Sequence, residues 1–212
     1  GFASGVGFFT SSTQQTVAGT YYVDVYHRNP STSTNAAVQF AVAYGNKNGS
    51  GSVGDANTVG QNVNDTPTRA IYSQYRNLLL PPTDLGFSFG SGVSKVTPDD
   101  IFVININRAR YRQKIDPGNW EIRIASGSGH LSGSGGTGSF ITFCDDSGAN
   151  TDPSVGSSGR IFNIMSGSSG ITTGSTIYGL FYPDAGVLVF NATLLSSSLG
   201  MVSTTEFNRT AT

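Results

Sequence analysis

The chain has 212 residues, enough for one large β domain or two small ones, and either could bury a substantial core. Only 12% of the residues are charged and the net charge is −1, which argues against a nucleic-acid-binding protein, because such proteins are usually basic overall. The one cysteine excludes an internal disulfide framework and a cysteine-based zinc site. The sequence has no run of about 18 apolar residues, so we expect no transmembrane helix and no membrane partner.

The beginning of the chain predicts an arm followed by a β-hairpin. Residues 1–20 are rich in glycine, serine and threonine and lack periodicity, so we expect an extended arm. The arm begins with Gly1 rather than Met, as in a processed chain or a piece of a longer one. Residues 21–28 and 37–44 are rich in β-branched and aromatic side chains, and the polar loop between them predicts a hairpin.

The one helix that we expect covers about residues 67–80. Pro67 suits the first position of a helix, and apolar side chains then recur at helical spacing. Pro81 and Pro82 end the helix, since the residue before a proline is driven out of the α region. A short strand is predicted next, at residues 85–89.

The stretch from residue 101 to residue 124 predicts two strands joined by a tight turn. Residues 101–106 are apolar at nearly every position, as in a strand buried on both faces. Basic residues then alternate with others up to residue 115. We therefore expect the strand to continue and to carry four cations on one face: Arg108, Arg110, Arg112 and Lys114. Residues 116–119 (DPGN) predict a type II turn, because proline suits its second position and glycine its third, and residues 120–124 return as a strand.

The rest of the chain predicts more strands and a tail. The strands are expected at residues 139–144, 160–165, 176–182 and 187–192, the last two as a hairpin. Together the patterns predict a mainly β protein, a sandwich or barrel-like arrangement of antiparallel sheets with one short helix. We expect three regions: an extended arm at 1–20, a single β-rich domain at 21–195 and an extended C-terminal tail at 196–212.

Several signals of chemistry are present, and none of them predicts an active site. Residues 86–90 match the G-x-S-x-G pattern around a nucleophilic serine, but that pattern requires a following helix, and a glycine turn follows Ser88. His27 and His130 lack the spacing of a zinc site. Residues 145–152 offer oxygen ligands for Ca²⁺ without the ligand order of an EF-hand. We therefore expect no catalytic, cofactor-binding or metal-binding residues, and no enzyme.

The four cations are the strongest signal of an interaction, since neighbouring like charges repel one another unless a partner or solvent intervenes. One interpretation is a solvated face balanced by Glu121 and nearby aspartates. A second is contact with an acidic neighbouring subunit, and a third, with least support, is contact with nucleic acid. On the second interpretation the candidate protein-interface residues are Arg108, Arg110, Tyr111, Arg112 and Lys114.

Three stretches of the chain resemble a known family of phage proteins. They are residues 69–80 (RAIYSQYRNLLL), 108–121 (RARYRQKIDPGNWE) and 179–191 (GLFYPDAGVLVFN). They are similar to large virion structural proteins of T4-like tailed phages that infect marine cyanobacteria, over roughly residues 40–200. The resemblance implies a non-enzymatic component of the particle, and it brings no catalytic residues with it.

We therefore expect a structural subunit located in the virion, in the tail or baseplate rather than in the capsid lattice. Its partners would be other virion proteins, with self-association in a symmetric assembly, through the β domain and the extended arms. Nucleic acid is not an expected partner. The alternative is a carbohydrate-binding or adhesive β domain of a phage or cell surface, in which exposed aromatic residues stack on sugars: Tyr21, Tyr22, Tyr26 and Trp120.

Overall fold

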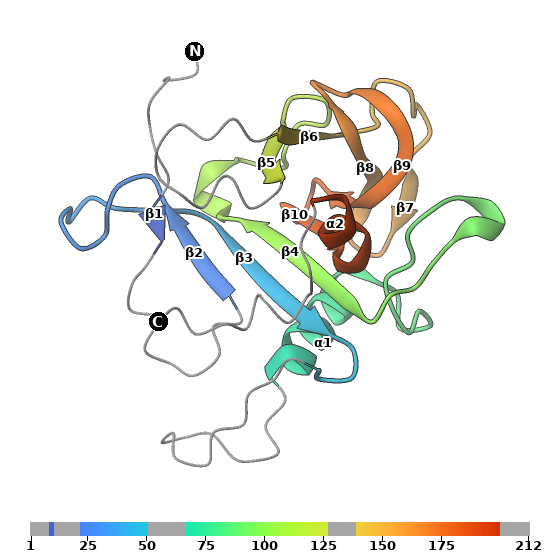
Figure 1. The fold of residues 1–212 in the computed structure, drawn as a ribbon, viewed down its shortest axis with the longest axis horizontal. Helices are drawn as coiled ribbons and strands as arrows, with labels where there is room; N and C mark the ends of the chain where they lie inside the picture. Colours follow the sequence, from blue (N-terminus) through green and yellow to red (C-terminus); the bar gives the residue numbers. More distant parts are fainter. Residues whose placement is uncertain (1–8, 11–21, 51–66, 127–138, 200–212) are drawn as a thin grey trace.

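One antiparallel sheet, curled into a half-barrel, forms most of the molecule (Figure 1). The computed structural model of the protein describes residues 9–10, 22–50, 67–126 and 139–199. Nine strands follow one another in the order β1-β2-β3-β4-β10-β9-β8-β6-β5, and β7 pairs with β8 beside this path. The mainly β, barrel-like antiparallel fold predicted from the sequence is confirmed.

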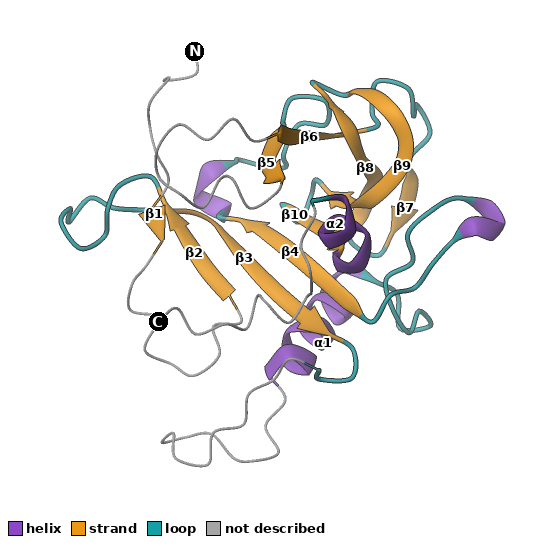
Figure 2. Ribbon diagram, in the orientation of Figure 1, coloured by secondary structure: helices purple, strands orange, loops and turns teal. Residues whose placement is uncertain are grey.

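The first half of the sheet is built from β1 (Phe9–Thr10), β2 (Tyr22–Tyr26), β3 (Val38–Asn46) and β4 (Asp100–Ile106). The second half is built from β5 (Ile122–Ser126), β6 (Ser139–Asp145), β7 (Ser154–Gly156), β8 (Gly159–Ser168), β9 (Ile171–Tyr182) and β10 (Val187–Asn191). Two short α-helices, α1 (Pro67–Leu79) and α2 (Ala192–Ser198), pack against the sheet (Figure 2).

Strand β4 is buried on both of its faces, as residues 101–106 predict. Ile101 and Val103 belong to the hydrophobic cluster beneath α1, whereas Phe102 and Ile104 belong to the cluster beneath α2. The neighbouring strand β10 alternates in the same way, and its Val189 pairs with Val103. The two helices therefore cover opposite faces of the central strands.

Helix α1 confirms the predicted helix at 67–80, but the strand predicted after it is wrong. Residues 85–89 contain only one isolated bridge, between Phe89 and Val96. Phe87 and Phe89 are instead buried in the cluster of α1, and the Phe87 N–H donates to the Tyr72 hydroxyl at 3.3 Å. The alternation of aromatic side chains here reflects packing under the helix rather than strand pairing.

Helix α2 is absent from the sequence prediction and shortens the predicted tail. The Asn191 side chain begins the helix by accepting a hydrogen bond from the Leu194 N–H at 3.1 Å. Leu195 and Leu199 are both buried in the inner cluster of the half-barrel. Helix α2 thus extends across the boundary predicted at residue 196, while residues 200–212 and nearly all of the predicted arm lie outside the described residues.

A candidate protein-interaction surface

The predicted long strand ends at Ile106, so the four cations do not lie on one strand face. Residues Arg108–Arg110 form a short 3₁₀ helix, and the chain remains irregular up to β5. The cause is Asn107, whose side chain accepts from the Ala109 N–H at 3.0 Å while its carbonyl accepts from the Arg110 N–H at 2.8 Å. These local bonds replace the pairing of a strand. We call residues 108–114 the basic segment.

Hydrogen bonds of the residues on either side of the basic segment, Asn107 and Ile115, hold it against the sheet. The Asn107 N–H donates to the Gln39 carbonyl at 2.9 Å, and its side-chain amide donates to the Val38 carbonyl at 3.1 Å. At the other end, the Ile115 N–H donates to the Pro183 carbonyl at 3.0 Å. The segment therefore spans from β3 to the turn between β9 and β10.

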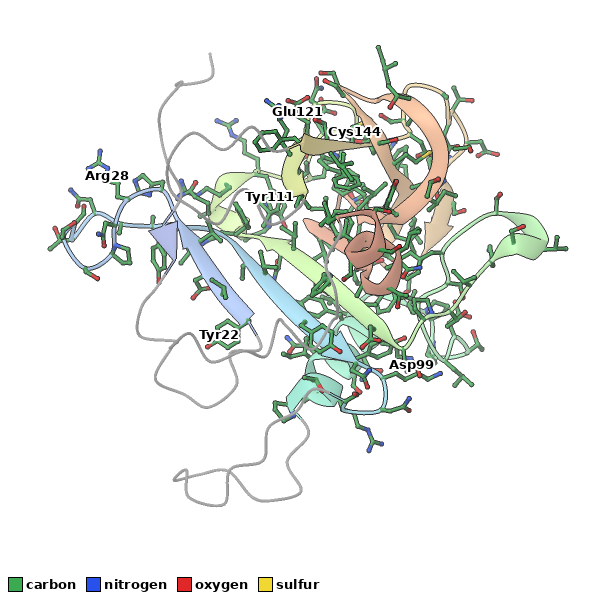
Figure 3. All side chains as sticks on the ribbon, in the orientation of Figure 1. Tyr22, Arg28, Asp99, Tyr111, Glu121 and Cys144 are labelled. Carbon is green, nitrogen blue, oxygen red and sulfur yellow. The ribbon has the colours of Figure 1, made fainter. Side chains whose placement is uncertain are left out.

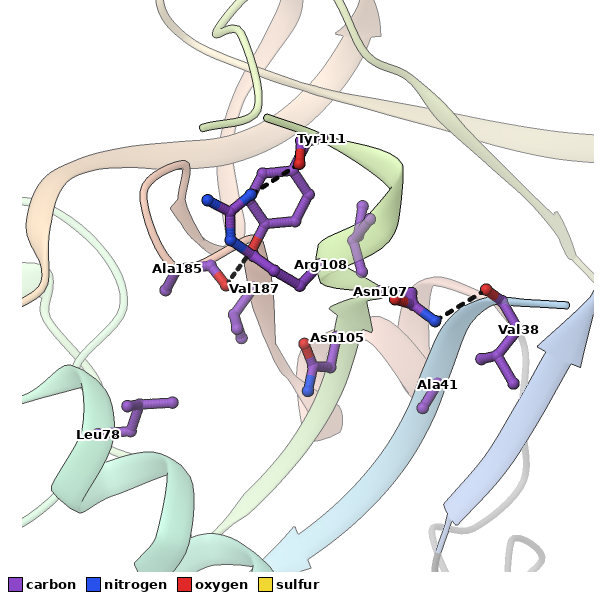
Figure 4. Close-up of a pocket in the computed structure, with 10 residues that line it drawn as sticks. Val38, Ala41, Leu78, Asn105, Asn107, Arg108, Tyr111, Ala185 and Val187 are labelled. Atoms are coloured by element: carbon purple, nitrogen blue, oxygen red, sulfur yellow. Dashed lines mark hydrogen bonds between the residues drawn. The ribbon is translucent and has the colours of Figure 1, made fainter. Parts of the chain in front are cut away.

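Tyr111 holds the middle of the basic segment (Figure 4). Its hydroxyl donates to the Ala185 carbonyl at 2.9 Å, and the Arg108 guanidinium lies 4.5 Å from the centre of its ring. Arg108 also donates to the Tyr111 carbonyl at 2.7 Å. Gly186 makes room for this ring, because a Cβ at residue 186 would overlap with the Tyr111 hydroxyl oxygen. The close packing explains why Tyr111 is half-buried although its neighbours are exposed.

The turn after the basic segment confirms the predicted type II geometry and is bound to a buried carboxylate. Gly118 has φ of +81°, and the Asn119 N–H donates to the Asp116 carbonyl at 3.2 Å. The Gly118 N–H also donates to both carboxylate oxygens of Asp145, at 3.1 and 2.8 Å. Asp145 is fully buried and accepts a further bond from the Ser147 N–H. It fixes the turn to the end of β6.

The neighbouring Asp146 has a structural role as well. It accepts hydrogen bonds from the backbone and side chain of Asn163 at 3.0 and 2.7 Å, and from the Asn150 side chain at 3.2 Å. In the segment considered for Ca²⁺, the carboxylates of Asp145 and Asp146 thus both already accept hydrogen bonds from N–H groups. In the described part of the chain, no group of three or more His, Cys, Asp or Glu side chains could hold a metal ion.

The four cations of the basic segment have no carboxylate partner within the part of the chain that the structure describes. Arg108, Arg110, Arg112 and Lys114 are all exposed, and none of them forms an ion pair within the described residues. Glu121, one of the expected balancing charges, instead accepts a hydrogen bond from the Ser168 hydroxyl at 2.6 Å. Among the described residues, Arg110, Arg112 and Lys114 are thus open to a partner or to solvent, whereas the exposed Arg108 guanidinium already donates to the Tyr111 carbonyl.

A hollow of about 400 Å³ lies beside Arg108 and Tyr111, between the sheet and α1 (Figure 4). Its lining combines apolar and amide side chains from four parts of the chain: Val38, Ala41, Leu78, Asn105, Ile106, Asn107, Arg108, Tyr111, Ala185 and Val187. Leu78 at its edge is 56% exposed. Arginine, tyrosine and apolar side chains around a concave surface are typical of protein–protein contacts.

Among the residues that it describes, the structure does not bring the other candidates from the sequence together into one site. The Ser88 hydroxyl hydrogen-bonds the Thr97 hydroxyl at 2.8 Å, and His27 bonds the backbone of Ala37. Cys144 and Glu121 lie at one side of the sheet, far from Tyr22 and Arg28 at the other (Figure 3). His130 lies outside the described residues.

The sequence identified the basic residues but not the groups that fix them. One signal in the sequence could have predicted that the strand ends at residue 106. Asn107 follows the apolar run, and asparagine is a common cap for a helical turn. Asp145 gave no such signal, because its partner Gly118 is 27 residues away in the chain.

No protein-family model, curated protein or solved structure matches the chain. Among the described residues, the helices are too short or too polar to cross a membrane. Function therefore has to be inferred from the resemblance of the sequence and from the geometry of the basic segment.

Proposed function

We propose that the protein is a non-enzymatic structural subunit of a tailed-phage particle, in the tail or baseplate, and that its basic segment binds an acidic surface of a neighbouring virion protein or of a second copy. The three stretches that resemble phage structural proteins support the first part. The second part is carried by one observation: four exposed cations project from a segment that hydrogen bonds hold at Asn107, Tyr111, Ile115 and Gly118.

Rigidity favours such a contact energetically. Ordering a flexible loop on binding costs about 1–2 kcal/mol per residue in backbone entropy, and the basic segment has already lost that freedom on folding. Within the described residues its cations form no ion pairs that would have to break before they meet a partner's carboxylates. Arginine suits this task because its planar guanidinium forms two parallel bonds with a carboxylate.

The distribution of charge makes the basic segment the dominant electrostatic feature of the protein. Four of the 12 lysines and arginines fall within these seven residues, in a chain of which only 12% is charged. A weakly charged surface allows copies to approach one another, and a concentrated basic patch then sets their orientation.

The adhesive alternative has less support from the geometry. Trp120 is half-buried, and its ring lies 5.0 Å from that of Phe181 in the interior, so it is not an exposed platform for a sugar. Tyr22 is 51% exposed, whereas Tyr26 is partly buried and Tyr21 lies outside the described residues.

The test is the double variant Arg110→Ser/Arg112→Ser in the phage that encodes the protein. Neither arginine forms a hydrogen bond or ion pair through its side chain among the described residues, so the variant should fold normally. We expect its incorporation into particles to fall about tenfold, which corresponds to about 1.4 kcal/mol of lost binding. The matched control is Arg28→Ser/Arg69→Ser, which removes two exposed arginines elsewhere on the surface.

Incorporation of the double variant at the normal level would overturn the proposed contact. A nucleic-acid role would give a different result. The isolated chain would bind DNA with an affinity that falls log-linearly with salt concentration, and the same double variant would lose this binding.

A further inference from the structure

A second cavity, of about 490 Å³, lies away from the basic segment, between the outer side of β8 and β9 and the loop that follows α1. Its volume is within the range of small-molecule sites. Its lining contains charged, polar and apolar side chains. They come from four stretches of the chain: residues 80–81, 84–95, 150–163 and 177–182. We call it the Tyr182 cavity.

The hydroxyl of Tyr182, a residue that lines this cavity, is an unsatisfied polar group. The residue is fully buried, packed in the cluster that contains Leu79, Phe87 and Phe89. Within the described residues its hydroxyl has no hydrogen-bond partner. Burial raises the pKa of this hydroxyl, and the carboxylate of Asp84, which lines the same cavity, raises it further. The group therefore remains a protonated O–H without an acceptor among the described residues, buried in the wall of the cavity.

Other polar groups in the lining offer bonds of both kinds. Asp146 binds the side-chain amides of Asn150 and Asn163 through their N–H groups, which leaves their carbonyl oxygens as acceptors. Ser91 and Ser154 are exposed at the edge of the cavity and add hydroxyls. This combination suits a ligand that bears several hydroxyl groups.

The remaining lining selects against charged ligands and provides apolar contact. Asp84 and Lys95 contribute one negative and one positive charge, which leaves no net charge to attract an anion or a cation. Ile161, Ile177 and Leu180 supply an apolar wall, against which the C–H groups of a sugar ring can pack. We propose that the Tyr182 cavity binds a neutral polyhydroxylated ligand the size of one or two sugar rings. This proposal does not depend on the proposed role of the basic segment.

The test uses the full chain labelled with ¹⁵N and titrated with neutral sugars: methyl α-glucoside, methyl β-galactoside and N-acetylglucosamine, each up to about 50 mM, to detect millimolar binding. We expect at least one of them to shift the amide resonances of Tyr182, Leu180 and Asn163. Tyr182→Phe removes only the hydroxyl and should weaken that sugar about tenfold.

Val155→Trp tests the site without altering the buried hydroxyl. Val155 is 77% exposed and lines the cavity, so the larger side chain should block entry and abolish binding. Val93→Trp is the matched control, because Val93 is fully exposed on the loop that follows α1 and does not line the cavity. Shifts confined to other parts of the chain, equal affinity in Tyr182→Phe, no response to any sugar, or binding of sodium phosphate alone would each overturn the proposal.

Discussion

Gly118 and Asp145 fix the turn that follows the basic segment. The Gly118 N–H reaches a carboxylate that is fully buried, so the bond is shielded from water. A buried carboxylate without its donors would be costly, since a lost hydrogen bond to a charged group is worth about 1.5–3 kcal/mol. This one contact connects the turn to the core of the sheet.

Gly118→Val should therefore destabilise the protein by about 3–5 kcal/mol. Valine resists the φ of +81°, and its Cβ would lie 3.0 Å from the Ser147 hydroxyl oxygen. Urea unfolding measures the effect. Gly92→Val is the matched control, because Gly92 also has positive φ, but a Cβ added there would have no atom within 4 Å. Equal unfolding free energies for the two variants would contradict the close packing of the turn against Ser147.

Asp145→Asn tests the same contact from the other side. The amide places an N–H group against the Gly118 and Ser147 donors, so we expect a loss of about 2–4 kcal/mol. Asp99→Asn serves as the control, because Asp99 accepts a bond from Asn48 at the exposed surface. Its unfolding free energy should change by less than about 0.5 kcal/mol. A similar change in the two variants would contradict the role assigned to Asp145.

Local sequence pattern predicts a helix, strand or turn correctly where one signal dominates. The apolar run at 101–106, the proline-started helix at 67–80 and the glycine turn at 116–119 each form as their residues predict. The basic segment and α2 differ because long-range or capping bonds determine them. The alternation of basic residues with others after residue 107 is typical of a strand. Hydrogen bonds to Val38, Ala185 and Pro183 determine the path of the chain there instead.

Helix α2 closes one side of the half-barrel, and its contribution can be measured. Leu195 is buried in the inner cluster, so Leu195→Ala should cost about 2–5 kcal/mol of unfolding free energy. Leu194, its neighbour on the same helix, is only partly buried, and Leu194→Ala should cost less than about 1.5 kcal/mol. If the two variants unfold at the same urea concentration, α2 does not pack as described.

For the whole molecule, buried tyrosines predict the response to alkaline pH. Burial raises the pKa of Tyr44, Tyr72, Tyr75 and Tyr182, so the folded protein disfavours tyrosinate more than the unfolded chain does. Their contribution to stability is complete below about pH 10, the unfolded value, and is lost as the pH rises above it. Tyrosinate absorbance from these residues should therefore appear together with the loss of β-sheet circular dichroism.

Tyr182→Phe should move this alkaline transition to higher pH, since it removes one of the groups that must ionise. Tyr22→Phe, at a half-exposed position, is the comparison and should leave the transition where it is. Tyrosinate signal that rises fully while the circular dichroism is unchanged would contradict the assignment of these hydroxyls to the core.

The proposed contact joins the basic segment to acidic residues of another molecule in the particle, and cross-linking tests it directly. A carbodiimide joins a lysine amine directly to a carboxylate in contact with it, and Lys114 is one of three lysines in the chain, with Lys47 and Lys95. The measurement is carbodiimide cross-linking of purified particles followed by mass spectrometry. Lys114→Arg, which retains the charge but lacks the amine, is the control.

We predict a link from Lys114 to an aspartate or glutamate of another virion protein or a second copy, absent in Lys114→Arg particles that still contain the protein. Particles that contain the protein and yield links from Lys95 but none from Lys114, or particles that lack the protein altogether, would contradict the proposed contact.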